Sequence, residues 1–194
     1  MRRIITGQLL LIICCIFYLI WWYRGYRPGV PVNRVSGING ILLFLTMAFG
    51  IAGVVFSLMQ IPEITEPKIH PVVIIITGIT AYIVLFLSTR FLFHRIVTAE
   101  LFLIVAWTML EVTVLNHLYA GGFLTDKSFV ILIIVIAFAF VISMILYVAY
   151  YRMEEMKAFY AAMIPLVTEA AAMAVLIGVA LLESSSSTIS NKIM

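Results

Sequence analysis

Residues Arg95–Gly122 read RIVTAELFLIVAWTMLEVTVLNHLYAGG, an apolar run long enough to cross a bilayer as one helix. Two carboxylates interrupt this run, Glu100 and Glu111. Because each helical residue turns by about 100°, both carboxylates and Trp107 fall on one face of the helix. A membrane helix keeps such a polar face away from lipid, so we expect the other helices of the chain to gather around it.

The composition indicates one integral membrane unit. Of the 194 residues, 64% are hydrophobic and 11% are charged, and the mean hydropathy is +1.19. An ordinary soluble domain has about 25% charged residues. The apolar runs are continuous, as in helices, and lack the alternation of a membrane barrel. The net charge of +3 is spread in small groups between the runs, which favours contact with lipid headgroups and excludes a nucleic-acid partner. The adjacent Cys14 and Cys15 supply neither a disulfide framework nor metal-site spacing.

Six apolar runs predict an all-α integral membrane protein, with six transmembrane helices in one bundle. The runs cover about residues 6–23, 38–61, 72–91, 98–122, 129–150 and 161–182. Residues 1–182 therefore form a single transmembrane domain, and residues 183–194, ESSSSTISNKIM, are expected to be a disordered polar tail. Gly121-Gly122 is a fitting stop for the fourth helix. Pro165 stands inside the sixth run, where it would kink the helix or free a backbone carbonyl before Glu169.

The chain also carries signs of an internal duplication. Residues 3–13, RIITGQLLLII, and 95–105, RIVTAELFLIV, are identical at six of eleven positions without a gap. The same offset carries the second run onto the fifth and the third onto the sixth, so the candidate repeats are residues 1–93 and 94–182. Repeats of three spans lie inverted in the membrane, as in many secondary transporters. Chance similarity between Leu- and Ile-rich runs is the alternative.

The loop charges suggest an orientation. Five Lys and Arg residues lie on the side of the two termini, and seven lie on the other side. The positive-inside rule then places both termini outside, in a plasma or inner membrane. Arg2 and Arg3 at the N-terminus argue the other way.

Glu111 and Glu169 are the candidate functional residues. Both stand near the middle of a predicted span, where a carboxylate costs roughly a few kcal/mol and must be protonated, paired or solvated. On helices that run in the same direction, the two could face one cavity and bind a cation or exchange protons. The predicted lining of that path is Trp107, Thr168 and Asn116. The alternative is that each carboxyl is neutral and forms a hydrogen bond to a neighbouring helix, which stabilises the packing of the two helices.

Glu100 has a structural interpretation. It follows Thr98, a plausible N-cap, in the first turn of its helix, where the helix dipole favours a negative charge. Arg90 and Arg95 are close enough in sequence to form an ion pair with it. The three histidines fall at span ends, which suits neither haem nor zinc, so no metal or cofactor is expected.

These features favour a small transporter or channel for a cation or small polar solute. The first alternative is a non-catalytic membrane subunit or assembly protein, in which the small-residue face at Gly50 and Gly53 docks a second copy or another membrane subunit. A membrane-embedded enzyme acting on a lipid is the third interpretation. It is disfavoured because the motifs of hydrolases, metalloproteases and nucleotide-binding enzymes are missing from the sequence.

Overall fold

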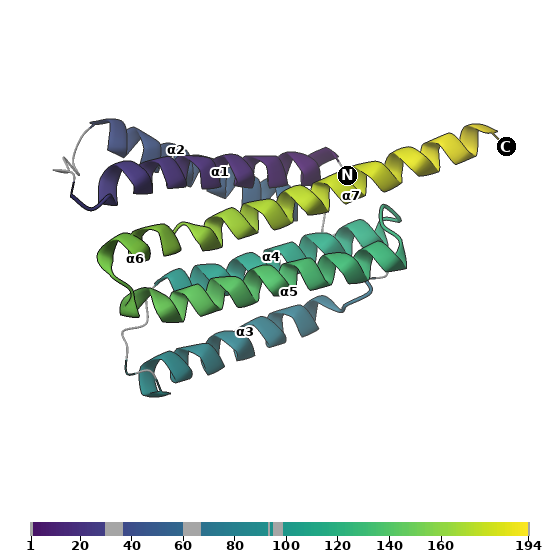
Figure 1. Cartoon of the computed structure of the whole chain (residues 1–194). Helices are drawn as coiled ribbons and strands as arrows, with labels where there is room; N and C mark the ends of the chain where they lie inside the picture. The colour runs from purple at the N-terminus through teal and green to yellow at the C-terminus, as the bar shows by residue number, and fades with distance from the viewer. Residues whose placement is uncertain (1, 30–36, 60–66, 93, 95–98, 194) are drawn as a thin grey trace.

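The computed structural model of the chain describes residues 2–29, 37–59, 67–92, 94 and 99–193, and for residues 99, 100, 151 and 186–193 it describes the backbone alone. Every element in these ranges is helical (Figure 1). In chain order they are α1 (Arg2–Tyr26), α2 (Gly37–Leu58), α3 (Pro71–Leu87), the π-helix η2 (Ser88–Leu92), α4 (Ala99–Ala120), α5 (Asp126–Ala149), the 3₁₀ turn η3 (Tyr150–Arg152), α6 (Glu155–Ala161) and α7 (Ile164–Ile193).

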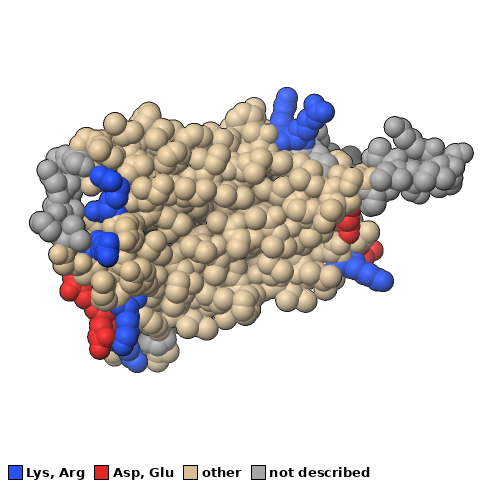
Figure 2. Space-filling model, turned by 45° about the horizontal axis from the view of Figure 1, so that its top comes forward, with Lys and Arg blue, Asp and Glu red and all other residues tan. Residues whose placement is uncertain are grey.

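Six helical stretches within the described ranges are long and apolar enough to cross a membrane. On the face shown in Figure 2, the charged side chains lie at the two ends of the molecule and the surface between them is uncharged. Large apolar side chains such as Ile134 and Phe138 on α5 are 62% and 66% exposed, as expected for a surface that faces lipid. The prediction of six long apolar helices is confirmed, and insertion into a membrane stays a prediction.

The long helices alternate in direction, and both chain termini lie at the same end of the bundle (Figure 1). We call this end, with Arg2 and Asp126, the termini end, and the opposite end, with Tyr26 and Glu155, the α6 end. Which end faces the cell interior stays a prediction.

Helix α7 lies at the centre of the molecule, between the α1–α2 pair and the α4–α5 pair (Figure 1). Helix α2 packs against α1, and α3 packs against α4. Near the termini end, α1, α4, α5 and α7 bury a compact apolar core. We call this core the apolar plug; it consists of Ile4, Val114, Leu115, Leu118, Leu124, Phe129, Leu132, Ile136, Leu176 and Ala180.

The packing of the helices does not follow the predicted duplication. Under that alignment α1, α2 and α3 correspond to α4, α5 and α7. Helix α7 packs closely against α5, whereas α3 packs against α4 and not closely against α2 in the described ranges. The inverted repeat therefore stays a prediction from the sequence, without support from this arrangement.

The small-residue face of α2 packs against α1 of the same chain. A Cβ on Gly53 would lie 2.7 Å from Leu11 Cγ and 3.0 Å from the Gly7 carbonyl oxygen. A Cβ on Gly7 would lie 2.6 Å from the backbone nitrogen of Ser57. Only glycine allows two helices to approach so closely. The expectation that Gly50 and Gly53 dock a partner is therefore corrected, because α1 already covers this face.

Helix α4 ends where the sequence predicts. Gly122 has a φ of +71°, which favours glycine. Its N–H donates to the Tyr119 carbonyl at 2.9 Å, and the Phe123 N–H donates to the Leu118 carbonyl at 3.0 Å. These two bonds form a Schellman motif, which satisfies the last carbonyls of the helix.

The sixth membrane-length stretch, Glu155–Ser185, consists of two helices, and the predicted span of residues 161–182 lies almost wholly in the second of them. After α6, two turn residues precede α7, so Pro165 stands in the first turn of α7 and not in the interior of a helix as predicted. Proline is well placed there because the first N–H groups of a helix have no intrahelical partner. Helix α7 then continues to Ile193, through the segment that was expected to be a disordered tail.

Candidate functional site

Glu111 lies in the middle of α4, about 18 Å along the helix from Ala99. Its side chain is 1% exposed. Neither carboxylate oxygen has a hydrogen-bond partner among the described residues. Since the large majority of buried side-chain polar atoms in proteins are hydrogen-bonded, this group calls for an explanation other than packing.

Trp107 lies one turn before Glu111, on the same face of α4. Its indole Nε1 is buried and, within the described part of the chain, also lacks a hydrogen-bond partner. The indole is close enough to interact with the Glu111 carboxyl, although the geometry falls outside that of a hydrogen bond.

Glu169 on α7 is 5% exposed. The buried hydroxyl of Ser143 on α5 donates to its Oε1 at 3.2 Å. The sequence analysis did not single out Ser143, although a hydroxyl in the most apolar run of the chain was an available signal. The two buried carboxyl groups therefore differ, because Glu169 has a hydrogen-bond donor and Glu111 has none among the residues described.

The two carboxyl groups lie close enough for their charges to interact. The Cys15 thiol on α1 is also close enough to interact electrostatically with both carboxyl groups. Side chains from α1, α4, α5 and α7 thus meet at one buried place. We call it the carboxylate site, and it consists of Cys15, Trp107, Glu111, Ser143 and Glu169. The apolar side chains around it include Leu11, Leu110, Leu166, Ala170 and Met173.

The apolar plug lies between the carboxylate site and the termini end. Along α4, Val114 and Leu118 follow Glu111 toward that end, and along α7, Leu176 follows Glu169. These plug residues are at most 1% exposed. Closely packed apolar side chains leave no polar partners for water. The apolar plug therefore separates the carboxylate site from the termini end in this structure.

Asn116, which was predicted to line the same path, binds a loop instead. Its Nδ2 donates to the Ile69 carbonyl at 2.6 Å, and its Oδ1 accepts from the Ile69 N–H at 2.9 Å. Five residues past Glu111, it points about 140° away around α4. The prediction is corrected: Asn116 fixes the segment before α3 and is not part of the carboxylate site.

The other predicted site residues do not join the carboxyl pair. The Thr168 hydroxyl donates to the Pro165 carbonyl at 2.8 Å, so it is bonded within the first turns of α7. Arg90 is exposed in η2, which follows α3. The ion pair predicted for Glu100 cannot be followed, because Arg95 and the Glu100 side chain lie outside the described residues.

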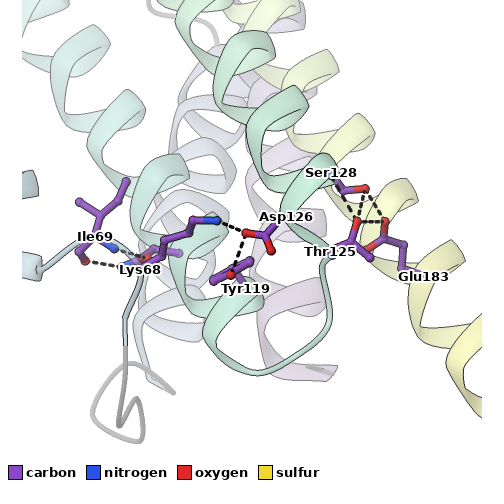
Figure 3. A network of polar contacts seen from close by, with 8 residues as sticks. Lys68, Ile69, Tyr119, Thr125, Asp126, Ser128 and Glu183 are labelled. Atoms are coloured by element: carbon purple, nitrogen blue, oxygen red, sulfur yellow. Dashed lines mark hydrogen bonds and ion pairs between the residues drawn. The ribbon is translucent and has the colours of Figure 1, made fainter.

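A second polar cluster closes the termini end (Figure 3). Lys68 forms an ion pair with Asp126, and its ammonium lies 4.2 Å from the centre of the Tyr119 ring. The Tyr119 hydroxyl donates to the same Asp126 oxygen at 3.0 Å. These contacts join the segment before α3 to α4 and α5.

Glu183 joins α7 to the same cluster (Figure 3). It accepts from the Thr125 N–H at 2.7 Å, from the Thr125 hydroxyl at 3.0 Å and from the Ser128 hydroxyl. A carboxylate at the N-terminus of α5 is also favoured by the helix dipole. We call the whole group the termini cluster; it consists of Lys68, Asn116, Tyr119, Thr125, Asp126, Ser128 and Glu183.

The carboxylate site offers acid–base and cation chemistry. In the described part of the chain, no group of three or more His, Cys, Asp or Glu side chains is placed to hold a metal ion. Two neighbouring carboxyl groups resist carrying two negative charges at once, so such a pair can share one proton or contact one cation.

Comparisons with known protein families, characterised proteins and solved structures gave no match. The function must therefore be inferred from the geometry and chemistry of the site.

Proposed function

We propose that the protein is a small membrane transporter or channel for a cation or small polar solute, with Glu111 and Glu169 as its proton- or cation-binding groups. Six apolar helices are compatible with a multi-pass membrane protein. The observation that carries the proposal is the Glu111 carboxyl, which is 1% exposed and has no hydrogen-bond partner among the described residues.

The cost of this arrangement supports a functional role. A buried polar group without a partner costs about 1–3 kcal/mol, and a charged group costs more. A carboxyl group that served only to hold helices together would have a donor or acceptor on a neighbouring helix. Ionisable side chains inside membrane spans commonly mark the paths of ions or protons. The proximity of Glu169 adds a second group that can share the proton or cation.

The apolar plug requires a change of shape during transport. In the described arrangement the plug separates the site from the termini end. The break between α6 and α7 at residues 162–163 lies about two turns from Glu169 and offers a place where the α6 end can move. Alternating exposure of a site near the midplane is the general mechanism of secondary transporters.

Proton flux into liposomes tests the proposal. Purified protein is reconstituted with a pH-sensitive dye inside. Proton flux is driven in one experiment by a potassium diffusion potential and in another, at zero potential, by a gradient of an inorganic cation. We expect flux in the native protein and a loss of about 100-fold or more in Glu111→Gln, because glutamine keeps the shape but cannot release a proton.

Glu155→Gln is the matched control, since Glu155 is an exposed carboxylate on α6. It should retain native flux. Native flux in the double variant Glu111→Gln, Glu169→Gln would contradict the proposal.

A non-catalytic membrane subunit is the second candidate, and a groove on the outside of the bundle favours it. The groove, about 340 Å³ in volume, lies between α3 and α4. Its apolar lining would suit a side chain from another membrane protein. In that case the native protein shows no flux, and the double Glu→Gln variant still assembles with its partner. The groove is lined by Gly78, Ile79, Tyr82, Phe102, Val105, Ala106 and Met109.

A further inference from the structure

We infer that Ser143 is a positioning residue that gives the two buried carboxyl groups different roles. It holds Glu169 as a hydrogen-bond acceptor, so that Glu111 carries the exchangeable proton. This inference rests on the proposed function and specifies how the same site would work.

The Ser143 hydroxyl behaves unlike three threonine hydroxyls inside the helices. Thr46, Thr108 and Thr113 each donate to the carbonyl oxygen four residues earlier in their own helix, which is the usual choice of a hydroxyl in an apolar helix. Ser143 instead donates across to Glu169 of α7. Its hydroxyl is thus bonded to a carboxyl group and not to a backbone carbonyl of its own helix.

A hydroxyl donor favours the ionised form of the carboxyl that accepts from it. Glu169 has such a donor, whereas Glu111 has none among the residues that the structure describes. An anion without a donor in an apolar interior is the costlier of the two. When the pair holds one proton, that proton therefore resides on Glu111, and the nearby negative charge of Glu169 helps to keep it there.

The charge balance of the site follows from this division. When Glu111 releases its proton to water, the site carries two negative charges. The charge is restored when a proton returns to Glu111 or when a cation lies between the two carboxylates. The site can therefore exchange one proton for one monovalent cation without a net change of charge.

Two other titratable side chains border the site. The Cys15 thiol of α1 interacts with both carboxyl groups. Tyr147 is buried one turn from Ser143 on α5. Both are far weaker acids than a carboxyl group, and Cys15→Ala and Tyr147→Phe identify any signal that they contribute.

Infrared spectroscopy of the purified protein in lipid tests the inference without any transport assay. A protonated carboxyl without a hydrogen bond has a carbonyl stretch at higher frequency than one with a hydrogen bond. We expect one such high-frequency band near neutral pH, absent in Glu111→Gln and present in Glu169→Gln. In Ser143→Ala, a second carboxyl band should appear at a pH about one to two units higher than in the native protein, because Glu169 has lost its donor.

Ser143→Thr keeps a hydroxyl and should restore the native pH profile, whereas a purely structural role for Ser143 would leave the profile unchanged in Ser143→Ala. Ser128→Ala removes the other serine of α5, which contacts Glu183, and should leave the interior bands as they are. A high-frequency band that vanishes in Glu169→Gln, or persists in Glu111→Gln, would overturn the inference. The expected bands in a protein without flux would refute the proposed transport and leave the assignment of the proton in place.

Discussion

Asn116 and Glu111 stand five residues apart on α4, and both are almost fully buried, at 2% and 1% exposure. Asn116 makes two hydrogen bonds to the backbone of Ile69. Glu111 makes none with the residues that the structure describes. One helix therefore carries two buried polar side chains, of which one is hydrogen-bonded and the other is not hydrogen-bonded to any described residue.

The same contrast separates the two polar regions of the molecule. In the termini cluster, hydrogen bonds and an ion pair link α4, α5, α7 and the segment before α3. In the carboxylate site, the one such bond among the described side chains joins Ser143 to Glu169. Polar groups that stabilise a fold are normally satisfied, and groups that must exchange a ligand are not. The difference supports the proposal that the termini cluster stabilises the fold and that the carboxylate site exchanges a proton or cation.

Asn116→Ala should have the largest effect on stability. It removes two hydrogen bonds and leaves the Ile69 N–H and carbonyl without partners, so we expect a loss of about 2–3 kcal/mol in the free energy of unfolding. Denaturant unfolding in detergent, followed by circular dichroism, measures the loss. Thr113→Ala, one turn earlier on α4, removes a hydroxyl that bonds within its own helix and should be nearly neutral. Equal losses in the two variants would mean that the Asn116 hydrogen bonds to Ile69 stabilise the fold no more than a hydroxyl bonded within its own helix.

Glu183→Gln should have a smaller effect. The amide keeps an acceptor for Thr125 but loses the charge at the N-terminus of α5, so we expect a loss of about 0.5–1 kcal/mol. The same unfolding experiment measures it, with Glu155→Gln as the exposed control. Flux should not change, since Glu183 lies outside the carboxylate site. A variant of native stability that lost flux would place Glu183 in the transport path.

The smallest effect concerns the pH dependence of the Lys68–Asp126 pair. The hydrogen bond to Asp126 raises the pKa of Lys68 above its ordinary value of 10.5. A raised lysine pKa means that the stabilisation is fully present below the unfolded value and is lost as the pH rises through the folded value. The native melting temperature should therefore fall slightly more between pH about 9 and about 12 than that of Lys68→Met. Because the pair is largely exposed, identical profiles would mean that it contributes nothing measurable.

The parts of the fold that depend on local chemistry could be predicted from the sequence. The length of each apolar run predicted the six long helices. The glycine pair at the end of the fourth run predicted where α4 stops, because a helix often ends at a glycine with positive φ, as Gly122 has. Counting residues along the runs placed Glu111 and Glu169 at depth. These features depend on the composition of one segment at a time.

The parts that depend on which helices are neighbours could not be predicted. The partner of Asn116 is the backbone of Ile69, and no residue pattern marks a carbonyl and an N–H as accessible. The glycine face of α2 was visible in the sequence, but its occupant is α1, which leaves no free surface there for a partner. Ser143 joins the site because α5 packs against α7, and helix contacts of this kind are set by the whole bundle.

Glu111→Leu, measured for both stability and flux, tests the central claim most directly. If Glu111 is kept for function at a cost to the fold, the leucine variant is at least as stable as the native protein, by up to about 1–3 kcal/mol, and carries no proton flux. A variant that is clearly less stable and retains native flux would contradict the claim, because Glu111 would then be a structural residue like Asn116.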